Sequence, residues 1–228
     1  MKLRKFSDIL ALAEKHHGAS GVKARLTEPM SVDTPDLGQS DDRFLAGMTK
    51  AIFSSGFSWE VVEQKWPGFE EAFDGFDPHK VAFYADKDVA RLLKDAGIIR
   101  NGAKIQSTIA NARFLVDTAK QHGSFSAFLK SWPPSDQIGL MEHLKKNAAR
   151  LGGSTAMYFL RFNGWDAFIL SADVVKALIR EGVVDKAPTS KADMRAVQDA
   201  FNAWTKDSGR PQREVSRILS LSVGPSGE

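Results

Sequence analysis

Residues 149–182 read ARLGGSTAMYFLRFNGWDAFILSADVVKALIREG, and the rest of the chain is interpreted outward from this stretch. Two glycines, Gly152 and Gly153, separate two segments whose apolar residues recur at helical spacing. Ser154 and Thr155 follow them and are residue types that cap a helix start. A glycine turn lets backbone approach a ligand closely, and the helix after it offers unpaired N–H groups to an anion. The stretch therefore predicts helix, hairpin, helix, with a turn that can hold a phosphate.

A carboxylate lies at the start of the next expected helix, where Ser171-Ala172-Asp173 precedes Val174. A glycine hairpin over about residues 136–163 with such an aspartate after it resembles the helix-hairpin-helix DNA glycosylases. In that superfamily the hairpin grips the DNA backbone and the aspartate assists cleavage of the base–sugar bond. The alternative for Asp173 is a helix cap that complements the helix dipole.

The composition describes a globular chain of 228 residues with a net charge of +3, a pI near 9.0 and no cysteine. Absence of cysteine excludes disulfides, thiolate chemistry and the usual ligands of a structural zinc ion. We expect neither a metal nor an organic cofactor. The start of the sequence is amphipathic and lacks the apolar block of a signal peptide, so we expect a cytoplasmic protein that does not enter a membrane.

Apolar residues recur at spacings of three and four along most of the chain, most clearly at Ile105, Ile109, Ala112, Val116 and Ala119. No segment alternates apolar and polar residues as a half-buried strand does. We therefore predict an all-α fold of about ten helices, arranged as a two-lobed domain over residues 1–228. It includes C-terminal helices over 190–222, and residues 27–42 are expected to form a surface loop.

Between Phe53 and Leu115 the sequence resembles the DNA-3-methyladenine glycosylase I family. The resemblance is carried by several blocks in order, which are SGFSW (55–59), FEEAF (69–73), FDPHKVA (76–82), DAGIIRNGAKIQ (95–106) and NAR (111–113). It implies a two-lobed helix-hairpin-helix glycosylase fold and a base-releasing hydrolase. Residues 1–42 and about the last forty resemble the family poorly.

The resemblance also implies roles for residues near the motif tryptophan. Gly56 and Phe57 would form the wedge that enters the gap left by a flipped base, and Trp59 would line the base pocket. The family's pocket carboxylate lies eight positions before that tryptophan, where this chain has Ala51. The pocket is therefore expected to be more apolar than the family's, and Trp59 could instead pack in the core. We also place Phe53 and Tyr158 in the pocket.

DNA-backbone contacts are predicted for the hairpin and for polar residues beside the family blocks, because phosphates accept hydrogen bonds from amides, hydroxyls and cationic side chains. The predicted set is Gly152, Gly153, Ser154, Thr155, Arg150, Lys104, Arg100 and Asn101. The family's zinc site, which clips its termini together, lacks its cysteines here. The expected partner is double-stranded DNA that contains damaged bases, bound by a monomer.

We hypothesise a monofunctional DNA N-glycosylase of base-excision repair that releases alkylated purines such as 3-methyladenine, with Asp173 as the catalytic carboxylate. No lysine lies at the hairpin end where bifunctional relatives carry a lyase nucleophile. A glycosylase-fold protein that binds distorted DNA without chemistry is the first alternative, because Ala51 replaces the pocket carboxylate. A helical module that binds protein partners is the second.

Overall fold

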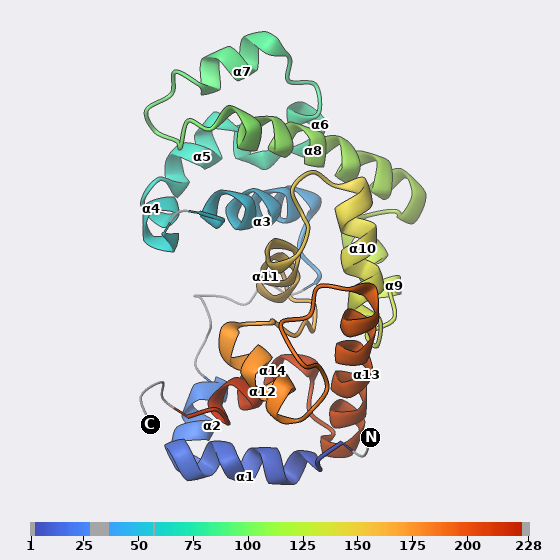
Figure 1. Ribbon diagram of the computed structural model, residues 1–228. Coiled ribbons are helices and arrows are strands. Elements are labelled where there is room, and N and C mark those ends of the chain that lie inside the picture. Colours follow the sequence, from blue (N-terminus) through green and yellow to red (C-terminus); the bar gives the residue numbers. More distant parts are fainter. Residues whose placement is uncertain (1–2, 28–36, 57, 225–228) are drawn as a thin grey trace. The chain divides into compact units, whose positions relative to one another are not determined.

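The structure is a computed structural model that describes residues 3–27, 37–56 and 58–224. The described residues form helices and no strand, which confirms the all-α prediction (Figure 1). They contain fourteen α-helices and one 3-10 helix, more than the expected number. Between residues 59 and 92, Pro67, Gly75 and Pro78 divide the chain into short helices. Most of the surface loop predicted at 27–42 lies outside the described residues.

The chain divides into two compact units, and each is described by itself. Unit 1 comprises Met1–Thr34, Pro134–Ile138 and Asp166–Glu228, and unit 2 comprises Pro35–Pro133 and Gly139–Trp165. The glycine hairpin therefore belongs to unit 2, whereas Asp173 belongs to unit 1. The single glycosylase-like domain over residues 1–228 stays a prediction.

Unit 2 is built around the longest helix, α8 (Gly102–His122), which packs against α3, α6, α7 and α9 (Figure 1). The predicted apolar stripe of α8 is buried at Ile105, Ile109 and Ala112. The other elements of the unit are α3 (Asp41–Ser54), α4 (Trp59–Gln64), α5 (Trp66–Ala72), η1 (Asp74–Phe76), α6 (Pro78–Val81), α7 (Asp86–Leu92), α9 (Phe125–Ser131), most of α10 (Gln137–Asn147) and α11 (Ser154–Phe162).

Stacked aromatic rings fill the space between α5, η1 and the chain before α7. The ring centroids of Trp66 and Phe69 are 5.5 Å apart, those of Phe69 and Phe73 are 6.2 Å apart, and Phe73 lies 5.5 Å from Phe76. Tyr84 extends the row at 6.3 Å from Phe73. Buried aromatic rings contribute large apolar areas, so this row fixes the short helices although each is too short to be stable alone.

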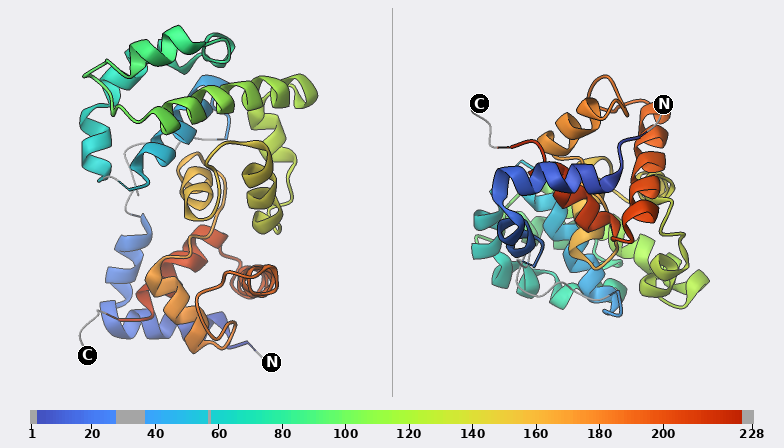
Figure 2. Two further views of the ribbon diagram at one scale, coloured as in Figure 1. Left: turned by 45° about the horizontal axis from the view of Figure 1, so that its top comes forward. Right: turned by 90° about the horizontal axis from the view of Figure 1, so that it is seen from below.

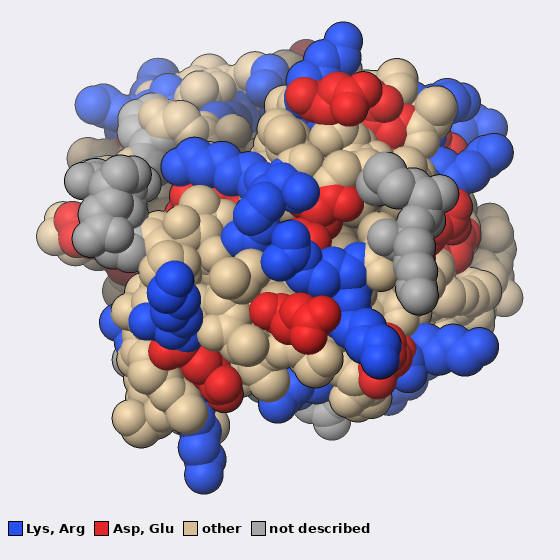
Figure 3. Space-filling view, turned by 60° about the horizontal axis from the view of Figure 1, so that its bottom comes forward, with Lys and Arg blue, Asp and Glu red and all other residues tan. Residues whose placement is uncertain are grey.

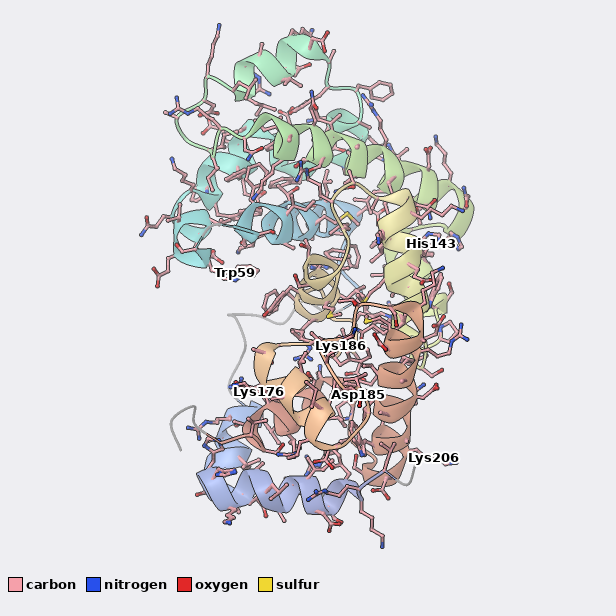
Figure 4. All side chains as sticks on the ribbon, in the orientation of Figure 1. Trp59, His143, Lys176, Asp185, Lys186 and Lys206 are labelled. Atoms are coloured by element: carbon pink, nitrogen blue, oxygen red, sulfur yellow. The ribbon has the colours of Figure 1, made fainter. Side chains whose placement is uncertain are left out.

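An aromatic cluster with a histidine joins α9 and α10 (Figure 4). The ring centroid of His143 lies 5.1 Å from that of Phe128 and 5.5 Å from that of Trp132. Burial, followed by the charges of His122 and Lys146, lowers the pKa of His143. The neutral imidazole is therefore the form that the folded chain favours.

Unit 1 contains α1 (Phe6–His17), α2 (Ala19–Thr27), α12 (Ala172–Arg180), α13 (Lys191–Ser208) and α14 (Gln212–Leu221). α1 packs against α2, α13 and α14 (Figure 2). The apolar core of the unit includes a stacked pair, Phe168 and Phe201, whose ring centroids are 4.2 Å apart. The observed α13 and α14 agree with the helices expected over 190–222.

A buried carboxylate ties the N-terminal segment to the end of the chain in unit 1. The side chain of Glu181 is 2% exposed and accepts from Arg4 Nε at 2.9 Å and from Arg180 Nε at 2.7 Å. Arg180 also donates to the carbonyl oxygen of Ser222 at 2.6 Å and to its hydroxyl at 2.8 Å. These contacts link both ends of the described chain.

Candidate nucleic-acid interface

The hairpin between α10 and α11 has a backbone that only particular residues adopt. Gly153 has φ 57° and ψ −135°, a conformation that residues with a Cβ rarely take, and it is the N-cap of α11. Ser154 is the first helical residue, and no side chain bonds at this cap. The capping role predicted for Ser154 and Thr155 is therefore wrong, because the glycine already turns the chain into the helix. The first turn of α11 still presents N–H groups without partners in the helix, as an anion site requires.

Arg150 lies in the same hairpin, is exposed, and has φ 58° although it is not a glycine. A non-glycine residue in the left-handed region persists only where surrounding contacts hold it, and such residues cluster at functional sites. The contacts come from Asn111 on α8. Its Nδ2 donates to the Ala149 carbonyl at 3.1 Å, and its Oδ1 accepts from the Ala149 N–H at 2.7 Å.

Trp59, at the start of α4, is 39% exposed (Figure 4). Its ring centroid lies 6.2 Å from that of Tyr158 and 5.3 Å from that of Phe162, both in edge-on contact. Tyr158 and Phe162 are one turn apart on α11. The alternative that Trp59 packs in the core is therefore wrong. Its ring lies at the edge of an aromatic surface formed with Tyr158 and Phe162 of α11, the helix that follows the hairpin.

Phe162 was absent from the predicted site, although its spacing of four from Tyr158 places both on one helix face. The structure does not bring Phe53 to this surface. Its side chain is 0% exposed, and its ring packs edge-on against Phe69 at 4.7 Å. Ala51 is 6% exposed on α3. A direct contact between Phe53 and a base is therefore not supported by this arrangement.

The turn between α3 and α4 contains Gly56, which is exposed and has φ 85°. Phe57, the other half of the predicted wedge, lies outside the described residues. Lys104 donates from Nζ to the carbonyl oxygens of Phe53 at 3.1 Å and Ser55 at 2.6 Å. The lysine is 7% exposed, so the structure buries the ammonium that was expected to reach phosphate.

Two more predicted backbone-binding residues lie just before α8. Asn101 is its N-cap, and its Oδ1 accepts from the Lys104 N–H at 3.1 Å. Arg100 is exposed. On the face drawn in Figure 3, positive and negative side chains are interspersed, so a DNA-binding surface has to be argued from individual residues. A net charge of +3 does not by itself mark a DNA-binding surface.

Asp173 is in the first turn of α12, in unit 1. Ser171 is the cap, because its side chain accepts from the Val174 N–H at 3.3 Å. Asp173 is therefore not the cap, but it is the acidic residue of the first turn and complements the helix dipole, as the structural alternative expected. Its side chain is 43% exposed and pairs with Lys176 at 3.1 Å, which leaves a carboxylate accessible to solvent.

A groove of about 840 Å³ lies elsewhere in unit 2, and none of the predicted site residues lines it. Its walls come from the chain around α6, α7 and α8 and include His79, Phe83 and Arg113. Within the described part of the chain, no three His, Asp or Glu side chains gather as a metal ion would require. In the same residues, no helix has the length and apolar composition needed to cross a bilayer.

A family model described as methyladenine glycosylase matches residues 38–162, more than half of the chain. The chain belongs to the methyladenine glycosylase family. Residues 38–162 cover the hairpin, the aromatic surface and α8, whereas Asp173 lies beyond their end.

Two curated relatives of this methyladenine glycosylase family member match a segment of 78 residues. DNA-3-methyladenine glycosylase 1 of Escherichia coli (strain K12) is 41% identical over 78 residues, which is 34% of this chain and 42% of the relative. DNA-3-methyladenine glycosylase of Haemophilus influenzae is 33% identical over 78 residues, with the same shares covered. The chain thus spans less than half the length of the curated relatives that it matches.

Solved structures support the fold. 3-Methyladenine DNA glycosylase I from Staphylococcus aureus matches with a TM-score of 0.53 at 24% identity, over 68% of this chain and 92% of that chain. A variant of 3-methyladenine DNA glycosylase I in complex with 3-methyladenine matches with a TM-score of 0.51 at 24% identity, over 57% of this chain and 80% of the other. At these identities the likeness concerns the fold alone.

Proposed function

We propose that this chain is a monofunctional DNA N-glycosylase of base-excision repair that flips out alkylated purines, such as 3-methyladenine, and releases them by hydrolysis. The observation that carries the proposal is the position of Trp59, which is 39% exposed and contacts Tyr158 and Phe162. An accessible aromatic ring that packs against the helix after the glycine hairpin offers a face on which a flipped base can stack.

The hairpin and the turn before α4 support the DNA-binding part of the proposal. A phosphate at the start of α11 would accept from the backbone N–H groups of Ser154 and Thr155, with the Arg150 cation beside it. Gly56 is exposed and has no side chain, so the backbone of its turn can come close to the gap between two base pairs. The partner is double-stranded DNA containing damaged bases, bound by a monomer in the cytoplasm, and binding weakens as salt rises.

In the hydrolysis, the sugar carbon C1′ loses one bonding electron pair to the base and gains another from water. The bond between the sugar C1′ and the base nitrogen breaks with its electrons going to the base, and water then adds to C1′ and loses a proton. Positive charge that develops on the sugar is stabilised by a nearby carboxylate. We assign this role to Asp173, the solvent-accessible carboxylate of α12. A base methylated at a ring nitrogen is already a good leaving group, so binding supplies much of the acceleration.

The deciding experiment measures free bases released from methylated duplex DNA. Trp59→Ala and Asp173→Asn should both slow release, and Asp173→Asn should leave DNA affinity nearly unchanged. Asp185→Asn is the matched control, because Asp185 is another exposed carboxylate of unit 1. Intact DNA binding without release of any methylpurine would exclude the enzyme.

A second function is favoured by Ala51, which occupies the position where the resemblance places the pocket carboxylate. Without that charge, a glycosylase fold could bind distorted DNA and carry out no chemistry. The same assay separates the two proposals, since a binder retains salt-dependent affinity for abasic or mismatched duplexes and has no turnover for Asp173→Asn to reduce.

A further inference from the structure

One face of α8 carries buried polar side chains that reach three other parts of unit 2. Lys104, Thr108 and Asn111 are 7%, 0% and 0% exposed. They are spaced by four and three residues, which aligns them on one side of the helix. Buried polar groups destabilise a fold unless they are hydrogen-bonded, so the partners of these residues show what the face does.

The first residue of this face holds the end of α3. Lys104 Nζ donates to the Phe53 and Ser55 carbonyl oxygens at 3.1 and 2.6 Å, and lies 5.6 Å from the centre of the Phe53 ring. The last carbonyls of a helix have no partners within it and carry the negative end of its dipole. An ammonium is therefore well placed there, and it fixes the turn that contains Gly56 and leads to Trp59.

The last residue of the face holds the hairpin. Asn111 makes both backbone hydrogen bonds of Ala149, and Thr108 between the two ends lies 3.3 Å from Thr49 of α3, oxygen to oxygen. At 1.5 Å per residue, Lys104 and Asn111 are about 10 Å apart along the helix. One rigid helix thus sets the spacing between the turn before Trp59 and the hairpin.

Arg150 connects the two ends electrostatically. It follows Ala149 in the hairpin, where its exposed guanidinium can meet a phosphate. Burial and then the charge of Arg150 lower the pKa of Lys104. A phosphate that neutralises Arg150 would remove that repulsion and strengthen the hold of Lys104 on the turn.

We propose that Lys104 is a positioning residue that links the hairpin's grip on the DNA backbone to the geometry of the turn before Trp59. The proposal rests on the proposed glycosylase function for its kinetic consequence, but its electrostatic part does not. Lys104 contacts neither DNA nor base in this role, which replaces the direct phosphate contact that its position in the sequence indicated.

The first experiment is independent of catalysis. The ammonium of Lys104 is titrated by NMR in the full chain, with and without a duplex containing an abasic site. We expect its pKa to rise in Arg150→Gln and to rise in the native chain when DNA is added. Lys120→Gln is the control, because Lys120 lies sixteen residues along α8, about 24 Å away, and should leave the titration unchanged.

The second experiment compares single-turnover base release with DNA affinity in Lys104→Met, which keeps the volume of the side chain and removes its charge. We expect release to slow by a factor on the order of ten to a hundred, as small misplacements of a reacting centre do, with affinity changed much less. Lys104→Arg, which restores the cation, should recover part of the rate. Lys120→Met should match the native chain.

The proposal would be overturned if the pKa of Lys104 stayed the same in Arg150→Gln and on addition of DNA. Equal losses of base-release rate and DNA affinity in Lys104→Met would also overturn it. If the native chain binds DNA and releases no base, the glycosylase function fails. The NMR titration then still decides whether the charge of Arg150 in the hairpin affects the pKa of Lys104.

Discussion

Alanine substitution of the two hairpin glycines should have unequal effects, although the sequence presents them as a pair. At Gly153 the backbone has φ 57° and ψ −135°, and an added Cβ would meet nothing within 4 Å. The penalty of Gly153→Ala is thus conformational, about 1–3 kcal/mol for an essentially glycine-only region. At Gly152 the nearest atom to an added Cβ is Lys145 Cγ at 3.4 Å, an ordinary contact with a flexible side chain. Gly152→Ala should therefore change stability by less than about 0.5 kcal/mol.

The penalty at Gly153 can appear in either of two measurements. If the hairpin keeps its conformation, urea unfolding reports the full loss of stability. If the hairpin relaxes, the N–H groups at the start of α11 move, and fluorescence anisotropy with a duplex reports weaker binding, about tenfold for each 1.4 kcal/mol. Equal effects of Gly152→Ala and Gly153→Ala, or no effect of Gly153→Ala in either assay, would contradict the assignment of the hairpin conformation.

Two further predictions concern stability. Glu181→Gln should lower the free energy of unfolding by about 2 kcal/mol, because its 2% exposed carboxylate accepts two charge-assisted bonds from arginines that stay partly hydrated. Glu214→Gln is the comparison, because the Glu214 side chain is 31% exposed and pairs with Arg210 at the surface; this change should cost less than about 0.5 kcal/mol in urea unfolding. Equal losses of stability in the two variants would argue that the contacts of Glu181 do not stabilise unit 1. For His143, a lowered pKa means that the unfolded chain binds more protons, so its contribution is complete above about pH 6.5 and is lost as pH falls through the folded-state pKa. In His143→Phe, unfolding measured from pH 7.5 to 5 should depend less on pH, and an unchanged slope would exclude this histidine as the source.

Helix class and many helix starts could be read from local sequence, because they depend on neighbours a few residues away. Ser190 illustrates this, since its side chain accepts from the Asp193 N–H at 3.1 Å and the Asp193 carboxylate bonds back to the Ser190 N–H at 3.2 Å. Gly153 shows the limit of the same reasoning. A serine and a threonine after a glycine indicated a side-chain cap, whereas the glycine conformation made one unnecessary.

The role of Lys104 could not be read locally. Its acceptors lie 49 and 51 residues earlier in the chain, so no pattern of neighbouring residues shows that the ammonium is buried. The distance between Asp173 and the hairpin could not be predicted from local sequence either, because a separation of about twenty residues along the chain does not determine a distance in space. Tyr158 and Phe162 are the opposite case, since helical periodicity alone would have grouped them.

Two of the blocks that carry the resemblance, residues 95–106 and 111–113, contain residues that position other elements. Asn101 caps α8, Lys104 holds the turn before Trp59, and Asn111 holds the hairpin. Ala51, by contrast, departs from the family at a position that the resemblance places against the base. On the proposed function, a mutation in these blocks should disturb the turn before Trp59 and the hairpin together, whereas a change at Ala51 should alter which base fits. The resemblance therefore bears on the geometry of the site more directly than on the lesion that it selects, which is why base release has to be measured with several methylpurines.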